Sequence, residues 1–173
     1  MDLYERFYRP VYAYCRRRTM ADVVDDVVAD TFLTAWRRID DVPDDHEALP
    51  WLYGVAYRVL GNQRRGSARR RKLDERLASI GHPAPSLPHE VIVMGEESRQ
   101  VLAALDSLRL IDREVLRLSA WEELPQVEIA LVLDISVEAV RQRLHQAKRR
   151  LAKAYDRLDR ARITPAAQKG GAR

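Results

Sequence analysis

The sequence is poor in the residues that build disulfide-rich, all-β and membrane-embedded proteins. Among its 173 residues there are one cysteine and 7 glycines, and aromatic residues make up 7%. A single cysteine excludes an internal disulfide and a multi-cysteine zinc site, and few glycines disfavour the many turns of a β-sandwich or barrel. No apolar run reaches the length of a membrane span, and no secretory signal begins the sequence. These absences predict a cytoplasmic protein without membrane insertion.

The sequence also has few groups that carry catalysis or bind metals. His46, His82, His89 and His145 are scattered, with no cysteine or carboxylate at metal-binding spacing beside them. There is no glycine-rich phosphate loop and no nucleophile elbow. Cys15 stands among apolar and aromatic residues, which favours a packed thiol over a reactive one. We therefore expect neither enzymatic activity nor a metal or other cofactor.

Charge is abundant and unevenly distributed. The chain holds 30 basic and 26 acidic residues, and its net charge is only +4. Residues 22–47 contain nine acidic residues and two arginines, whereas residues 58–76 contain eight basic residues and two acidic ones. The basic segment suits nucleic acid and the acidic one suits a basic protein partner, although simple solvation explains an acidic helix equally well.

Hydrophobic periodicity predicts an all-α fold of two small helical domains on a short proline-rich linker. Gly81, Pro83, Pro85 and Pro88 break the pattern, so we predict domains at 1–78 and 91–160, a linker at 79–90 and a disordered tail at 161–173. Asp2 is a plausible cap of the first helix, and an acidic loop is expected over 40–50. The remaining predicted helices cover 22–39, 50–76, 91–108, 112–121, 125–133 and 136–158. The predicted apolar stripe of the second is Val24, Val28, Phe32, Ala35, Trp36 and Ile39.

The segment 125–158 has the pattern of a helix-turn-helix. Pro125 suits a helix start, Asp134 and Ile135 form a tight connection, and Ser136 is a good N-cap. Val137, Val140, Leu144, Ala147 and Leu151 then give the last helix its apolar stripe. Its other side carries the residues that we expect to contact DNA: Glu138, Arg141, Gln142, Arg143, His145, Lys148 and Arg149. Such a face suits the major groove, although a solvated amphipathic helix would also show it.

The helix predicted from Pro50 combines an apolar side with a side suited to nucleic acid. The latter carries Tyr53, Tyr57, Arg58, Gly61, Arg64 and Arg65. Tyrosines can stack on unpaired bases and arginines can neutralise phosphates, but both tyrosines could equally pack on another helix. Glycine inside a helix costs about 1 kcal/mol relative to alanine, so Gly61 suggests close approach of a ligand to the backbone.

Three stretches together resemble the extracytoplasmic-function (ECF) sigma factors of bacteria. Residues 25–36 (DDVVADTFLTAW) resemble the family helix that binds the beta-prime clamp of RNA polymerase, and residues 50–65 resemble the helix that recognises and opens the −10 element. Residues 127–147 resemble the helix-turn-helix that reads the −35 element. The sequence departs from the family at five positions. They are Ala29, often glutamine, Arg58 and Asn62, often asparagine and aspartate, Asp134, often glycine, and Gln146, often arginine.

The resemblance implies a promoter-specificity subunit that binds the polymerase clamp and beta subunit, promoter DNA and an anti-sigma protein. It implies polymerase contacts by Asp25, Asp26, Asp30 and Phe32, and it adds Asn62 to the −10 residues Tyr53, Tyr57, Arg58, Arg64 and Arg65. A flipped −10 base would be received around residues 40–47. The alternative is a free-standing regulator that does not join polymerase. Such a regulator would more often dimerise, and it would not need both an acidic helix and a Tyr/Arg helix.

Overall fold

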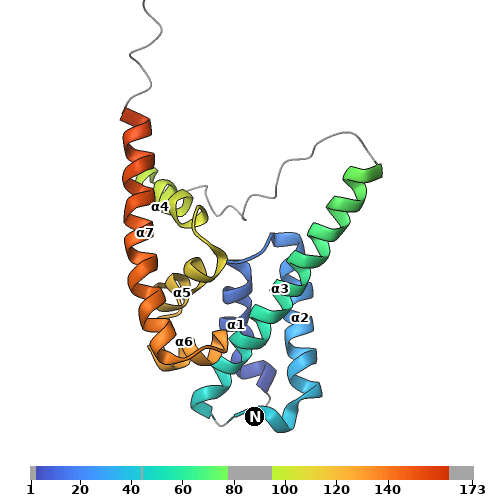
Figure 1. Ribbon diagram of the computed structural model, residues 1–173. Helices are drawn as coiled ribbons and strands as arrows, with labels where there is room; N and C mark the ends of the chain where they lie inside the picture. The colour runs from blue at the N-terminus through green and yellow to red at the C-terminus, as the bar shows by residue number, and fades with distance from the viewer. Residues whose placement is uncertain (1–2, 44, 78–94, 164–173) are drawn as a thin grey trace, which may run out of the picture. The chain divides into compact units, whose positions relative to one another are not determined.

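The computed structural model describes residues 3–43, 45–77 and 95–163. Every element in these ranges is helical, which confirms the predicted all-α class. In chain order they are α1 (Leu3–Arg16), α2 (Ala21–Arg37), the 3-10 helix η1 (Ile39–Asp41), α3 (Asp45–Leu77), α4 (Glu96–Asp106), α5 (Leu110–Ala120), α6 (Gln126–Leu133) and α7 (Val137–Ile163) (Figure 1). Three predicted features lie outside the described residues: the Asp2 cap, the linker at 79–90 and most of the tail. The last helix, α7, continues to Ile163, three residues past the domain boundary predicted at 160.

The first group of helices is α1, α2 and α3, which pack against one another. Each contributes apolar residues at helical spacing, so that burial of one stripe per helix excludes water from their common core. Thr31 is buried with them because its hydroxyl donates a 2.7 Å hydrogen bond to the Val27 carbonyl of its own helix. The largest fully buried side chains of this core are Val11, Tyr14, Val24, Val27, Leu52, Val55 and Leu60.

Two expectations for this region were wrong. Trp36 and Ile39 do not belong to the buried stripe, since they are 74% and 50% exposed. The helix expected from Pro50 begins at Asp45, which shortens the acidic loop predicted over 40–50. The helix takes in Asp45 and Glu47 before Pro50, because acidic residues are favourable in the first turn, where the helix dipole is positive.

The second group contains α4 and α5, which both pack on α7. Val115 and Leu118 of α5 and Val140 and Ala147 of α7 are fully buried. Gln100 of α4 donates to the Tyr155 carbonyl at 3.5 Å and to Asp159 Oδ1 at 3.4 Å, which ties α4 to the distal half of α7. Val137 was wrongly placed in the buried stripe: at the first position of α7 it is 42% exposed. None of the described helices is long and apolar enough to cross a membrane.

Candidate nucleic-acid interface

The turn between α6 and α7 has the geometry that the sequence predicts. Ser136 caps α7, because its Oγ accepts a hydrogen bond from the Ala139 N–H at 3.2 Å and its carbonyl accepts one from Val140 at 3.0 Å. Asp134 has a φ of 55°, the left-handed conformation that aspartate tolerates better than most residues. The cap and the left-handed residue together set the direction in which α7 leaves the turn.

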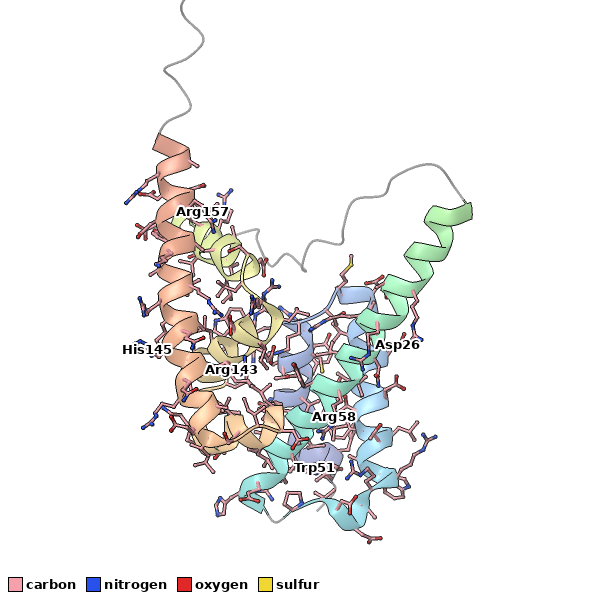
Figure 2. The ribbon with its side chains drawn as sticks, viewed as in Figure 1. Asp26, Trp51, Arg58, Arg143, His145 and Arg157 are labelled. Carbon is pink, nitrogen blue, oxygen red and sulfur yellow. The ribbon has the colours of Figure 1, made fainter. Side chains whose placement is uncertain are left out.

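The face of α7 opposite its buried stripe is open to solvent. Six of the seven residues predicted there are exposed, and Arg143 is half-buried at the edge of the face. Figure 2 shows His145 on the side of α7 that points away from α4 and α5. The exposed six are Glu138, Arg141, Gln142, His145, Lys148 and Arg149.

Glu138 organises the start of this face. Its carboxylate accepts a hydrogen bond from Gln142 Nε2 at 3.2 Å and forms an ion pair with Arg141 Nη2 at 2.6 Å. The hydrogen bond from Arg141 lowers the pKa of Glu138 below its ordinary value, so the carboxylate remains charged at neutral pH. Two side chains suited to base contacts are therefore held by one acceptor before any ligand arrives.

A second basic face lies on α3. Arg58, Asn62 and Arg65 are exposed, and their spacing of four and three residues puts them on one side of the helix. Arg65 Nη2 donates to Asn62 Oδ1 at 2.6 Å. Tyr57 and Arg64 flank the row and are half-buried. This row offers positive charge and one partly exposed aromatic ring, which suits a flexible single strand.

Tyr53 does not belong to the exposed face, so its expected placement there was wrong. It is 5% exposed and stacks on Tyr14 of α1, with ring centroids 4.6 Å apart and planes 19° apart. The Arg18 guanidinium lies 3.6 Å from the centroid of Tyr14. Tyr53 therefore packs on another helix, which is the alternative interpretation given above for both tyrosines.

Gly61 has room around it. A Cβ built there would meet only the Arg65 guanidinium, at an ordinary contact distance of 3.6 Å, and one at Gly66 would meet nothing within 4 Å. No neighbour in the described part of the chain therefore requires glycine at 61. Close approach of a ligand to this backbone stays a prediction.

The exposed face of α2 combines carboxylates with large apolar side chains. Asp25, Asp26 and Asp30 are exposed as predicted, and Leu33 and Trp36 are 47% and 74% exposed beside them. Sequence periodicity assigned Trp36 to the core and did not single out Leu33. Phe32 is half-buried, and its ring meets that of Tyr4 edge to face at 4.9 Å. The face fits a partner surface that is both basic and apolar.

Metal binding and thiol chemistry find no support in the described residues. They contain no group of three or more histidine, cysteine, aspartate or glutamate side chains placed to hold a metal. Cys15 is buried, and burial raises the pKa of its thiol to about 12. Since the thiolate is the nucleophilic form, Cys15 is a packing residue. His82 and His89 lie outside the described residues.

Comparison with known proteins identifies both helical regions. Residues 3–70 match the Sigma-70 region 2 family and residues 98–151 match the Sigma-70 region 4 family. The chain is 33% identical over 152 residues to the ECF RNA polymerase sigma factor SigL of Mycobacterium tuberculosis, covering 86% of this chain and 84% of SigL. It is 32% identical over 141 residues to the RNA polymerase sigma factor CnrH of Cupriavidus metallidurans, covering 77% and 73%.

The solved structure of CnrH in complex with the cytosolic domain of CnrY is also similar. The TM-score is 0.59 at 29% sequence identity, and the similarity covers 89% of this chain and 85% of that one. Three findings lead to the same family assignment. They are the order of the two family regions, the helix-turn-helix with its exposed face, and relatives above 30% identity along most of their length. The chain belongs to the ECF sigma factors, the RNA polymerase subunits that bring core polymerase to promoter DNA.

Proposed function

We propose that the three exposed faces divide the work of promoter recognition. In this proposal α7 reads the −35 duplex, α3 binds the −10 strand as it opens, and α2 docks on the beta-prime clamp of polymerase. The observation that carries it is the exposed Arg/Gln/Lys face of α7 behind the Ser136 cap. The domain boundaries at 1–78 and 91–160, with a linker at 79–90, belong to the same proposal.

Reading of the −35 element would use the first turns of α7. The major groove is wide enough for an α-helix and displays a different pattern of donors and acceptors for each base pair. Gln142 and Arg141 can bind base edges with two hydrogen bonds, while Lys148, Arg149 and the half-buried Arg143 suit phosphates. On entry into the groove, base edges replace Glu138 as the partner of Arg141 and Gln142, and Glu138 becomes free to accept from a cytosine amino group. His145 lies on the same exposed face and completes the proposed set.

Opening of the −10 element would use the row on α3. Arg58 and Arg65 neutralise phosphates of the separated strand, and Tyr57 offers its ring to an unstacked base. Asn62 and Arg64 complete this contact set, and the resemblance to the family puts a flipped base near residues 40–47. Tyr53 supports the row from behind through its stack on Tyr14.

Docking on polymerase would use the exposed face of α2. Asp25, Asp26 and Asp30 attract a basic surface, and Leu33 and Trp36 bury apolar area when it arrives. Phe32 contributes the part of its ring that Tyr4 does not cover. Contact with the polymerase beta subunit, which the family resemblance implies, belongs to the same proposal.

The remaining assignments follow from membership of the family. The solved relative CnrH is in complex with a protein partner, the cytosolic domain of CnrY. We propose that this chain also has a protein partner, and that this partner is an anti-sigma protein that controls it. We further propose that the chain acts in the cytoplasm, where polymerase and chromosome are, and that it has no catalytic activity of its own.

A transcription assay tests the proposal against the free-standing regulator. The purified chain is mixed with bacterial core polymerase, and run-off transcription is measured from a randomised template library. We expect the chain to co-purify with core polymerase at moderate salt and to select promoters with paired −35 and −10 elements. Failure to bind core polymerase would overturn the clamp assignment and favour the regulator. Asp26→Arg is the matched variant, because it reverses one exposed charge on α2 and should weaken polymerase binding selectively.

A further inference from the structure

A buried carboxylate on α5 is paired with an arginine of α7. The Asp112 side chain is 2% exposed, and its Oδ2 forms an ion pair and hydrogen bond with Nη1 of Arg150, whose side chain is 44% exposed. Asp112 lies in the first turn of α5, where the helix dipole also favours a negative charge. Removing one partner of such a pair leaves a buried charge without its counter-ion, so Asp112 holds Arg150 strongly.

Other ion pairs fix the helix that carries Asp112. Arg113 Nη1 lies 3.2 Å and Arg117 Nη2 3.5 Å from Asp106 Oδ1 at the end of α4, and Arg113 also donates to the Leu108 carbonyl at 3.3 Å. The beginning of α5 is therefore bound to the α4–α5 turn on one side and to α7 on the other. Asp112 is consequently a fixed point against which α7 can be oriented.

Arg150 occupies the boundary between the buried and exposed sides of α7. At the helical repeat it lies about 100° around the axis from Arg149 on one side and from Leu151 on the other. Val140, Leu144, Ala147 and Ala154 bury the neighbouring side of α7, and apolar contacts of this kind have no preferred direction of their own. A hydrogen-bonded ion pair has a preferred direction, so it adds an angular restraint near the DNA-facing turns to the packing.

We propose that Asp112 and Arg150 are positioning residues for −35 recognition. The pair sets the rotation of α7 about its axis, and thereby the angle at which Arg141 and Gln142 meet the bases. It also keeps the Arg150 guanidinium away from DNA, although neighbouring cations on α7 are free to bind phosphate. This inference rests on the proposed −35 role of α7.

The test compares sequence discrimination by holoenzymes. Core polymerase is combined with the full chain or with Arg150→Gln, Asp112→Asn or the control Lys153→Gln, which removes an exposed cation about one turn further along α7. Affinity is measured for a promoter fragment selected by the wild-type holoenzyme and for the same fragment with a scrambled −35 element. We expect Arg150→Gln and Asp112→Asn each to lower the ratio of the two affinities about tenfold, because misaligned helices lose base contacts. Lys153→Gln should leave this ratio unchanged.

The ratio of the two affinities distinguishes a positioning role from two alternatives, a phosphate contact by Arg150 and a merely structural role that lowers the folded fraction. Either alternative would weaken binding to both promoter fragments equally and leave the ratio at its wild-type value. That outcome overturns the inference. If Asp112→Asn fails to fold, Arg150→Gln decides alone, because its side chain is nearly half exposed. Gln142→Ala is measured in parallel. If Gln142→Ala lowers the ratio and Arg150→Gln does not, only the positioning role is wrong. If neither variant lowers the ratio, the −35 assignment of α7 is wrong as well.

Discussion

The two basic helices, α3 and α7, carry similar charge but hold it differently. On α7 the turn is capped, Glu138 holds Arg141 and Gln142, and an ion pair with α5 braces the helix. On α3 the bond between Arg65 and Asn62 joins two members of the exposed row, and no carboxylate among the side chains that the structure describes pairs with this row. Reading a duplex needs side chains aimed at base edges, whereas binding a separated strand needs charge and stacking surface that tolerate movement.

The largest effect should come from breaking the support of α7. Leu118 is fully buried in α5, so Leu118→Ala should lower the free energy of unfolding of the second helical region by about 3 kcal/mol. We expect calorimetry of thermal unfolding to show a lower transition temperature for this region only. Polymerase binding through α2 should persist while −35 selectivity is lost.

The matched control for this prediction is Leu52→Ala, which empties an equally buried position in α3. It should shift the other transition and weaken polymerase binding. A single transition that moves in both variants would show that the two regions unfold together, against the predicted domain division.

Removing one side chain from each basic face sharpens the contrast between them. Gln142→Ala should reduce holoenzyme affinity by about 1–3 kcal/mol on the selected −35 sequence and little on a scrambled one, because a base contact is lost. Arg65→Ala should weaken binding to all sequences and lower the salt slope by about 0.7, because a single-strand phosphate contact is lost. Electrophoretic mobility shifts over a salt series measure both. If Arg65→Ala changes sequence preference, α3 reads bases directly.

A glycine pair tests whether nucleic acid approaches the backbone of α3. Gly61→Ala and Gly66→Ala should each stabilise the helix by about 1 kcal/mol in thermal unfolding, because neither Cβ meets a tight neighbour. We expect only Gly61→Ala to slow opening of the −10 element. The opening rate is measured from the permanganate reactivity of unpaired thymines. Equal opening rates in the two variants would remove the proposed close approach at Gly61.

The smallest effect concerns the turns on either side of α6. Asp134→Gly should raise the free energy of unfolding by about 0.5–1 kcal/mol, because glycine adopts a φ of 55° without strain. Glu123→Gly, with a φ of 54° before α6, is the matched substitution and should behave alike. Urea denaturation measures both. Destabilisation by Asp134→Gly alone would mean that the aspartate side chain contributes to the helix-turn-helix.

Local features of the site were predictable because their causes lie within a few residues. Ser136 caps α7 through a bond to Ala139, and Asp134 takes a left-handed conformation within the tight connection predicted there. The exposed face of α7 followed from its own apolar spacing. In contrast, Pro50 does not mark the start of α3, because the acidic residues preceding it stabilise an earlier first turn that begins at Asp45.

Periodicity and capping act along one chain segment, so the all-helical class, the order of the helices and the helix-turn-helix follow from the amino-acid sequence. Which borderline residues face a neighbour depends instead on how the helices pack together. Tyr53 is buried against Tyr14, Trp36 remains in solvent, and Asp112 meets Arg150 across 38 positions of sequence. The physical reason is that helical spacing gives each residue an angle around its own axis, while the angles that become buried depend on where other helices pack.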